Sequence, residues 1–149
     1  MKMVTVLRSA RSGLVVGAAF MALLGAAPAF AADVTGLWAT PSRGGQVEIT
    51  KCGASVCGRL VSSEGIKADP ALKDANNTDA AQRGRLLKGL LILKGFAGGP
   101  TEWTGGEIYN AEDGKTYGGT LTLNADDTLN VRGCVFVPLC KTQTWTRVR

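Results

Sequence analysis

The amino-acid sequence predicts an all-β protein, an antiparallel sandwich or up-and-down barrel of roughly eight strands, behind an export signal. Short runs rich in β-branched and aromatic residues recur between residues 34 and 149, and turn-forming residues separate them. The chain also contains 20 glycines, which accommodate the bulges that help a sheet to close. Because closure removes exposed strand edges, we expect a barrel. A barrel of this size is filled by side chains or holds one small ligand.

The N-terminal segment has the pattern of a cleaved signal peptide. Three basic residues open it: Lys2, Arg8 and Arg11. An uncharged stretch follows, and Ala29-Phe30-Ala31 is a small-x-small cleavage site. Residues 12–32 are just long enough for a membrane anchor, but their Ala/Gly-rich composition favours a leader. We expect removal of residues 1–31, no stable membrane insertion, and a single β-barrel domain of residues 32–149 that is periplasmic or secreted.

The first half of the predicted domain contains four strand-like runs. Residues 34–40 contain Trp38, residues 46–52 alternate apolar and polar side chains, and residues 56–62 carry valine and leucine. Residues 86–96 are more continuously apolar, so we expect a strand buried on both faces there.

The second half reads as two hairpins. Residues 102–110 and 115–124 are joined by a turn that contains Asp113-Gly114, a strong hairpin signal. A turn rich in Asn and Asp then leads into residues 128–135, and the Thr-rich residues 141–149 form the last strand.

Residues 63–84 interrupt this pattern with a long polar loop. Within it, Asp79 is placed to cap a short helix that runs to Gln82 or Arg83, with Gly84 ending it. Connections of about 20 residues are uncommon in compact domains and are often functional. The loop is therefore either a lid over one mouth of the barrel or a solvated excursion.

The four cysteines, Cys52, Cys57, Cys134 and Cys140, favour two structural disulfides in an oxidising compartment. Each sequential pair flanks a short turn, which favours the pairs Cys52–Cys57 and Cys134–Cys140 among the three pairings. A four-thiolate zinc site and a redox pair are the alternatives, but both usually use C-x-x-C spacing. We expect no metal.

Composition excludes several chemistries. The chain has no histidine, which excludes Ser-His-Asp and Cys-His catalysis and imidazole-bound zinc. Outside the leader, 14 Lys and Arg face 12 Asp and Glu, so no charge pattern indicates nucleic acid. Glu102 and Glu107 lie five apart on one strand, which predicts opposite faces and no catalytic pair. We expect no cofactor and no catalytic residue.

Aromatic residues lie near both ends of the predicted domain. The first and last strands of a closed barrel are neighbours, so Arg147 can lie across the ring of Trp38 as a cation–π contact, with Trp145 nearby. We expect this group to close the barrel.

The chain resembles the exported bacterial family known as domain of unknown function 2147. The matching stretches are 36–38 (Gly-Leu-Trp), 47–49 with Cys52, 57–59, 74–90, 103–110, 114–117, 129–133 and 143–147. The resemblance implies a small lipocalin-like β-barrel and an envelope or secreted location, and it brings no established activity with it.

A non-enzymatic binder of a small, largely apolar ligand inside the barrel is the leading functional hypothesis. The predicted contacts are Trp103, Tyr109 and Tyr117 within the cup and Asp74, Asn77 and Arg85 at its mouth. The alternatives are an envelope protein-interaction or structural module with a filled barrel, and a histidine-independent enzyme. Such an enzyme would use Asp74, Lys115 and Tyr117.

Overall fold

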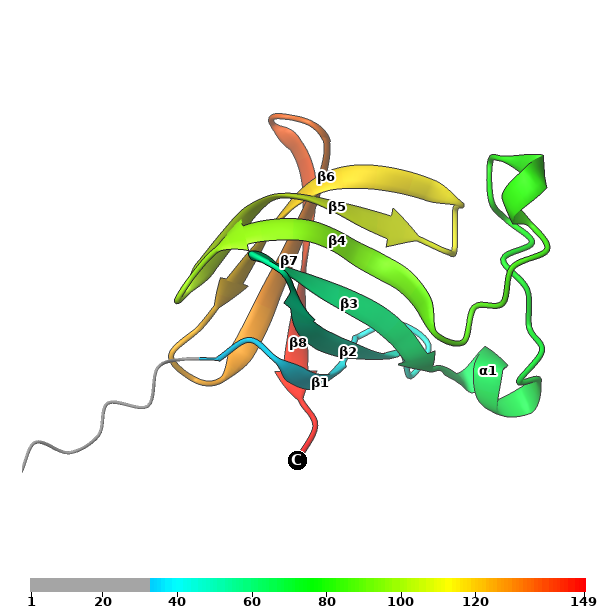
Figure 1. Cartoon of the computed structure of the whole chain (residues 1–149), viewed down its shortest axis with the longest axis horizontal. Coiled ribbons are helices and arrows are strands. Elements are labelled where there is room, and N and C mark those ends of the chain that lie inside the picture. Colours follow the sequence, from blue (N-terminus) through cyan, green and yellow to red (C-terminus); the bar gives the residue numbers. More distant parts are fainter. Residues whose placement is uncertain (1–32) are drawn as a thin grey trace, which may run out of the picture.

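The computed structural model describes residues 33–149, so the predicted leader lies outside the described residues. Its eight strands form a closed antiparallel barrel in which each strand pairs with the next and the first pairs with the last (Figure 1). They are β1 (Gly36–Ala39), β2 (Gln46–Cys52), β3 (Ser55–Ser62), β4 (Leu90–Gly98), β5 (Glu102–Asn110), β6 (Lys115–Leu123), β7 (Thr128–Phe136) and β8 (Leu139–Arg147). The predicted all-β up-and-down barrel is confirmed.

The long connection between β3 and β4 carries two short helices, α1 (Glu64–Ala68) and the 3-10 helix η1 (Ala80–Gln82). Asp79 caps η1 by accepting a hydrogen bond from the Ala81 N–H, as the sequence predicts. Helix α1 was not predicted, although Ser63 caps it in the same way at the Ile66 N–H. Neither helix of residues 33–149 is long and apolar enough to cross a bilayer.

The expectation for residues 86–96 was wrong in two respects. Strand β4 begins at Leu90, because Leu86 bridges to Lys73 and the Leu87 N–H bonds to the Leu72 carbonyl, so residues 86–89 belong to the loop. The strand is not buried on both faces either. Leu93 is fully buried whereas Lys94 is exposed, so one face is solvated.

A β-bulge corrects the prediction for Glu102 and Glu107. The pairing of β5 with β6 shifts between Trp103 and Gly106, which inserts one residue into β5. The insertion resets the alternation of side chains, and both carboxylates are exposed on the outside of the barrel. They are still too far apart in the strand to be adjacent.

Large side chains fill the centre of the barrel. Six of them are completely buried: Trp38, Val47, Leu93, Phe96, Leu121 and Leu129. Gly106 faces the ring of Phe96 so closely that a Cβ there would collide with it. Side chains therefore fill the barrel at this level. Two depressions, described below, lie toward its two ends.

Candidate functional site

Arg147 lies at the junction where β8 pairs with β1. Its guanidinium lies 4.2 Å from the centre of the Trp38 ring, in the stacking that the sequence analysis expects. The same group donates to the carbonyls of Asp33 and Thr35, both at 2.7 Å. Trp145 is also buried, and its indole N–H donates to Gln143. Arg147 thus fixes the segment that precedes β1 at one end of the barrel.

Four of the predicted site residues meet under the long loop. Asp74 is buried and accepts hydrogen bonds from the hydroxyl of Tyr109 at 2.6 Å and from the amide of Asn77 at 2.9 Å. Nε of Arg85 donates to the same carboxylate at 2.8 Å. The Arg85 guanidinium also lies over the Tyr109 ring, 4.8 Å from its centre. These polar groups are engaged with one another, and the cluster anchors the loop to β5.

Burial of the Tyr109 hydroxyl, reinforced by its hydrogen bond to Asp74, raises the pKa of Tyr109 above its ordinary value. The neutral phenol is therefore the form that the cluster holds. Tyr109 follows Ile108, which packs against the core, so its side chain faces outward and not into the cup.

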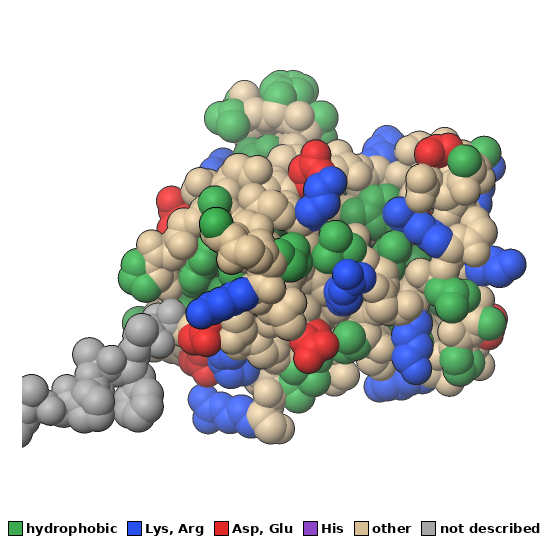
Figure 2. All heavy atoms as spheres, viewed as in Figure 1, with side chains coloured by type: hydrophobic (Ala, Val, Ile, Leu, Met, Phe, Trp, Pro, Cys, Tyr) green, Lys and Arg blue, Asp and Glu red, His purple; other side chains and the backbone are tan. Residues whose placement is uncertain are grey.

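An outer depression of about 280 Å³ adjoins this cluster, bounded by Arg85, Tyr109 and the start of β4. The ion pair of Lys94 with Glu107, 3.1 Å long and well exposed, forms another edge. Figure 2 shows basic side chains gathered at this end of the molecule, over the long loop.

A second depression lies at the opposite end, in the mouth of the barrel itself. It has a volume of about 330 Å³ and is lined by Asp33, Val34, Lys51, Val56, Gly98, Gly99, Pro100 and Trp103. Val34, Val56 and Trp103 belong to the buried core, so the floor of this pocket is the end of the barrel interior. We refer to these eight residues as the mouth pocket.

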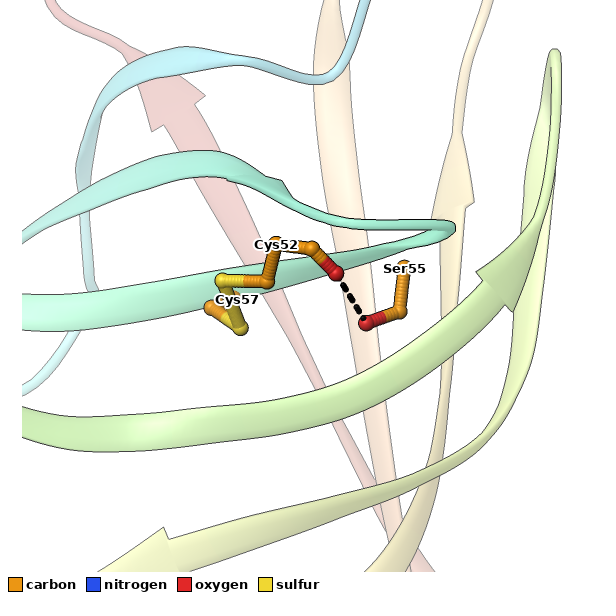
Figure 3. Close-up of a disulfide and its surroundings, with 3 residues drawn as sticks. All are labelled: Cys52, Ser55 and Cys57. Atoms are coloured by element: carbon orange, nitrogen blue, oxygen red, sulfur yellow. Dashed lines mark hydrogen bonds between the residues drawn. A yellow bond between two sulfur atoms is a disulfide. The ribbon is translucent and has the colours of Figure 1, made fainter.

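One wall of the mouth pocket is the β2–β3 hairpin, which supplies Lys51 and Val56. The disulfide Cys52–Cys57 braces this hairpin, and the Ser55 hydroxyl donates to the Cys52 carbonyl at 3.0 Å (Figure 3). The second disulfide joins Cys134 to Cys140 across β7 and β8. Both predicted pairings are confirmed, and the first holds a wall of the pocket in place.

Trp103 provides the mouth pocket with its hydrogen-bond donor. The indole N–H groups of the other two tryptophans are paired, Trp38 with the Val34 carbonyl and Trp145 with Gln143. The N–H of Trp103 makes no hydrogen bond to the described residues, although the residue as a whole is only 6% exposed. No buried side-chain nitrogen or oxygen of these residues lacks a partner, so this N–H is open to solvent.

Opposite charges lie at the rim of the same pocket. The hydrogen bond from the Thr35 backbone N–H, together with the Thr35 hydroxyl and the nearby charge of Lys51, lowers the pKa of Asp33. Asp33 is therefore a carboxylate near neutral pH, and it offsets the ammonium group of Lys51. The pocket thus has an apolar floor, the indole N–H donor of Trp103, and a rim on which one negative and one positive side chain offset each other.

The structure does not bring all of the predicted contacts together. Trp103 and Tyr109 lie toward opposite ends of β5, one at the mouth pocket and the other at the loop cluster. The Tyr117 hydroxyl donates to Asp113 at 2.5 Å and lines neither depression. A ligand role for these residues stays a prediction.

The partners of Trp103 in the mouth pocket were not predicted from the sequence. Lys51 and Val56 are paired across the β2–β3 hairpin, but Asp33 and Trp103 come from other segments that closure of the barrel brings to the same rim. The one available signal was the position of Lys51, beside a cysteine at the end of a strand.

Comparison with known proteins assigns a family. The family model described as an uncharacterised protein conserved in bacteria (DUF2147) matches residues 36–147. The chain belongs to this family. In the DUF2147 barrel, the match extends from the first strand to the last and thus includes Trp103 and the Arg147 closure.

A solved structure is similar to this DUF2147 chain. It is protein HP1028 from Helicobacter pylori, reported as belonging to the lipocalin family. The two share 25% sequence identity with a TM-score of 0.70, over 78% of this chain and 84% of the other. No curated protein shows significant similarity. Two disulfides and a bacterial family are consistent with an exported protein.

Proposed function

We propose that this protein is a non-enzymatic binder of a small, largely apolar ligand, and that the ligand occupies the mouth pocket. The observation that supports this proposal is the indole N–H of Trp103. Trp103 lines the pocket, and its N–H makes no hydrogen bond to the described residues and is open to solvent, so it is available to a ligand. Binding pockets are typically apolar with a few polar groups that set orientation. A ligand with an apolar body and one acceptor atom would satisfy this donor and cover Val34 and Val56.

The filled centre of the barrel limits how deep a ligand can enter. Trp38 and Phe96 are completely buried in the same core cluster as the pocket floor, so only a small molecule or one end of a longer molecule fits. The proposed site therefore lies at one end of the cup. The loop cluster around Asp74 lies at the other end of the barrel, so this proposal gives it the structural role of holding the loop.

Mass spectrometry of the protein purified from its native envelope tests the proposal directly. We expect a stoichiometric small molecule under native conditions, which organic extraction should release. A measured mass equal to that of the protein alone, with both disulfides formed, would count against a tightly bound ligand. Weak binding would then be measured by titration.

Titration with the fluorescent probe 8-anilinonaphthalene-1-sulfonate, an apolar molecule with acceptor oxygens, tests the site. Trp103→Phe keeps an aromatic ring and removes the donor, so we expect binding weakened about fivefold, equivalent to one hydrogen bond of about 1 kcal/mol. The matched control is Trp145→Phe, whose indole N–H bonds to Gln143 outside the pocket. Equal affinity of the two variants would reject the mouth pocket.

A protein-interaction module of the cell envelope is the second candidate, and the filled barrel centre favours it. Crosslinking in the native envelope distinguishes the two functions. A specific protein partner recovered with the chain, together with no extractable small molecule, would support the module and oppose the binder.

A further inference from the structure

The hairpin formed by β7 and β8 extends beyond the rest of the barrel. Strand β6 pairs with β7 only as far as Cys134, whereas the pairing of β7 with β8 continues to Phe136 and Leu139. In Figure 1 this hairpin projects at the top of the view, clear of the other strands. We call residues 135–139 the hairpin tip.

The hairpin tip is apolar and exposed. Its large side chains are Val135 (64% exposed), Phe136 (64%), Val137 (78%) and Leu139 (57%). Among the described residues, the fifth large hydrophobic side chain with comparable exposure is Leu86, in the long loop. Figure 2 shows hydrophobic side chains on the projection at the top of the molecule. Contiguous exposed apolar residues usually mark an interaction surface.

The disulfide Cys134–Cys140 lies directly below the tip. The two cysteines are opposite each other in the register of β7 and β8, so the bond joins the strands at the point where the support of β6 ends. A hairpin braced there keeps its tip presented and cannot splay to bury the apolar side chains against the barrel.

Positive charge surrounds the base of this hairpin. Arg132 and Lys141 are exposed, and neither belongs to an ion pair within residues 33–149. From residue 128 to residue 149 the sequence has no aspartate or glutamate. The hairpin therefore combines an apolar end with a cationic base, the two features by which peripheral proteins bind anionic lipid surfaces.

We propose that the hairpin tip is a peripheral docking element for an anionic lipid surface, into which Phe136 and Val137 insert while Arg132 and Lys141 contact the headgroups. A lipid surface suits the tip better than a protein does. Stable protein interfaces use about 20–30 residues a side, whereas a bilayer can surround five residues on all sides without a shaped groove.

Vesicle sedimentation tests this docking with the oxidised, purified protein. We expect binding to vesicles of equal parts phosphatidylglycerol and phosphatidylcholine, and weaker binding to phosphatidylcholine alone. Raising the salt from about 0.05 to about 0.5 M should weaken the binding, because salt screens the contribution of Arg132 and Lys141. No sedimentation with either vesicle would overturn the proposal.

Substitutions at the hairpin tip test whether the tip is the part of the protein that binds the vesicles. Phe136→Asp and Val137→Asp should each lower the partition coefficient by at least about tenfold, because both side chains are solvent-exposed and an inserted carboxylate is disfavoured. Leu86→Asp is the matched control, since it places the same charge at an exposed leucine in the loop. Equal losses in the control and the tip variants would contradict the assignment.

Sedimentation velocity without lipid separates docking on lipid from self-association. We expect the wild-type protein and Phe136→Asp to have the same oligomeric state. If Phe136→Asp instead dissociated an oligomer and left vesicle binding unchanged, the tip would be a protein contact and the proposal would fail.

Discussion

The hydroxyl of Tyr109 is the residue-scale feature with the clearest pH consequence. Burial and the hydrogen bond to Asp74 raise the pKa of Tyr109 above the ordinary tyrosine value near 10. The folded state therefore favours the neutral phenol. The resulting stability is complete below about pH 10 and is lost as the pH rises through the folded-state pKa. We expect the free energy of unfolding, measured with urea, to be independent of this group up to about pH 10 and to fall as the pH rises further.

Tyr109→Phe should remove most of this alkaline dependence. At neutral pH it should also lower the free energy of unfolding by about 1–3 kcal/mol, because the buried carboxylate of Asp74 loses a donor. Tyr117→Phe is the control, since its hydroxyl bonds to the exposed Asp113. The same pH slope in Tyr109→Phe and the wild-type protein would refute this account.

At the scale of elements, the bulge in β5 is a feature that the sequence did not predict. Alternation placed the strands and short spacing identified the disulfides, because both depend on neighbouring residues. The bulge depends on packing across the barrel. Gly105 has a φ of +72°, and Gly106 lies against Phe96, ten residues earlier in the chain. The Gly-Gly pair was visible in the sequence, but its partner was not.

Gly106→Ala tests the importance of that close approach. The new Cβ would collide with the Phe96 ring, so we expect a loss of about 1–3 kcal/mol in the free energy of unfolding. Gly118→Ala, in the next strand, adds a methyl group to open space and should be neutral or slightly stabilising. Urea denaturation of both variants measures the difference, and equal stabilities would show that the core yields easily around Phe96.

At the scale of the whole molecule, the barrel is closed by a short seam. Strand β1 pairs with β8 at two positions, Trp38 with Arg147 and Ala39 with Thr146. The side chain of Arg147 extends this seam by bonding to Asp127 and to two carbonyls that precede β1. Because Lys cannot make these bonds in a planar fork, Arg147→Lys should lower the free energy of unfolding by about 2–3 kcal/mol.

Hydrogen exchange would locate that loss. We expect the amides of β1 to exchange faster in Arg147→Lys, with those of β5 and β6 unchanged. Arg149→Lys is the matched control, because the side chain of Arg149 is 84% exposed. Uniformly faster exchange across the barrel would show that the seam does not open as a separate unit.

Closure also explains how much of the candidate site could be predicted. The contact of Arg147 with Trp38 followed from the topology, since the first and last strands of a barrel are neighbours. Trp103 was identified as an aromatic on a strand. Its pocket partners carry no motif. Lys51 and Val56 are neighbours in one hairpin, but their meeting with Asp33 and Trp103 depends on strand tilt and register, which residue patterns alone do not specify.

The position of Asp33 on the rim of the mouth pocket links maturation to binding. Cleavage after Ala31, as the leader predicts, would create a new α-amino group on Ala32, the residue next to Asp33. That group is mostly protonated at neutral pH, so processing would add a positive charge to the chain one residue before Asp33. We therefore predict that the precursor and the processed protein differ in their preference for anionic ligands.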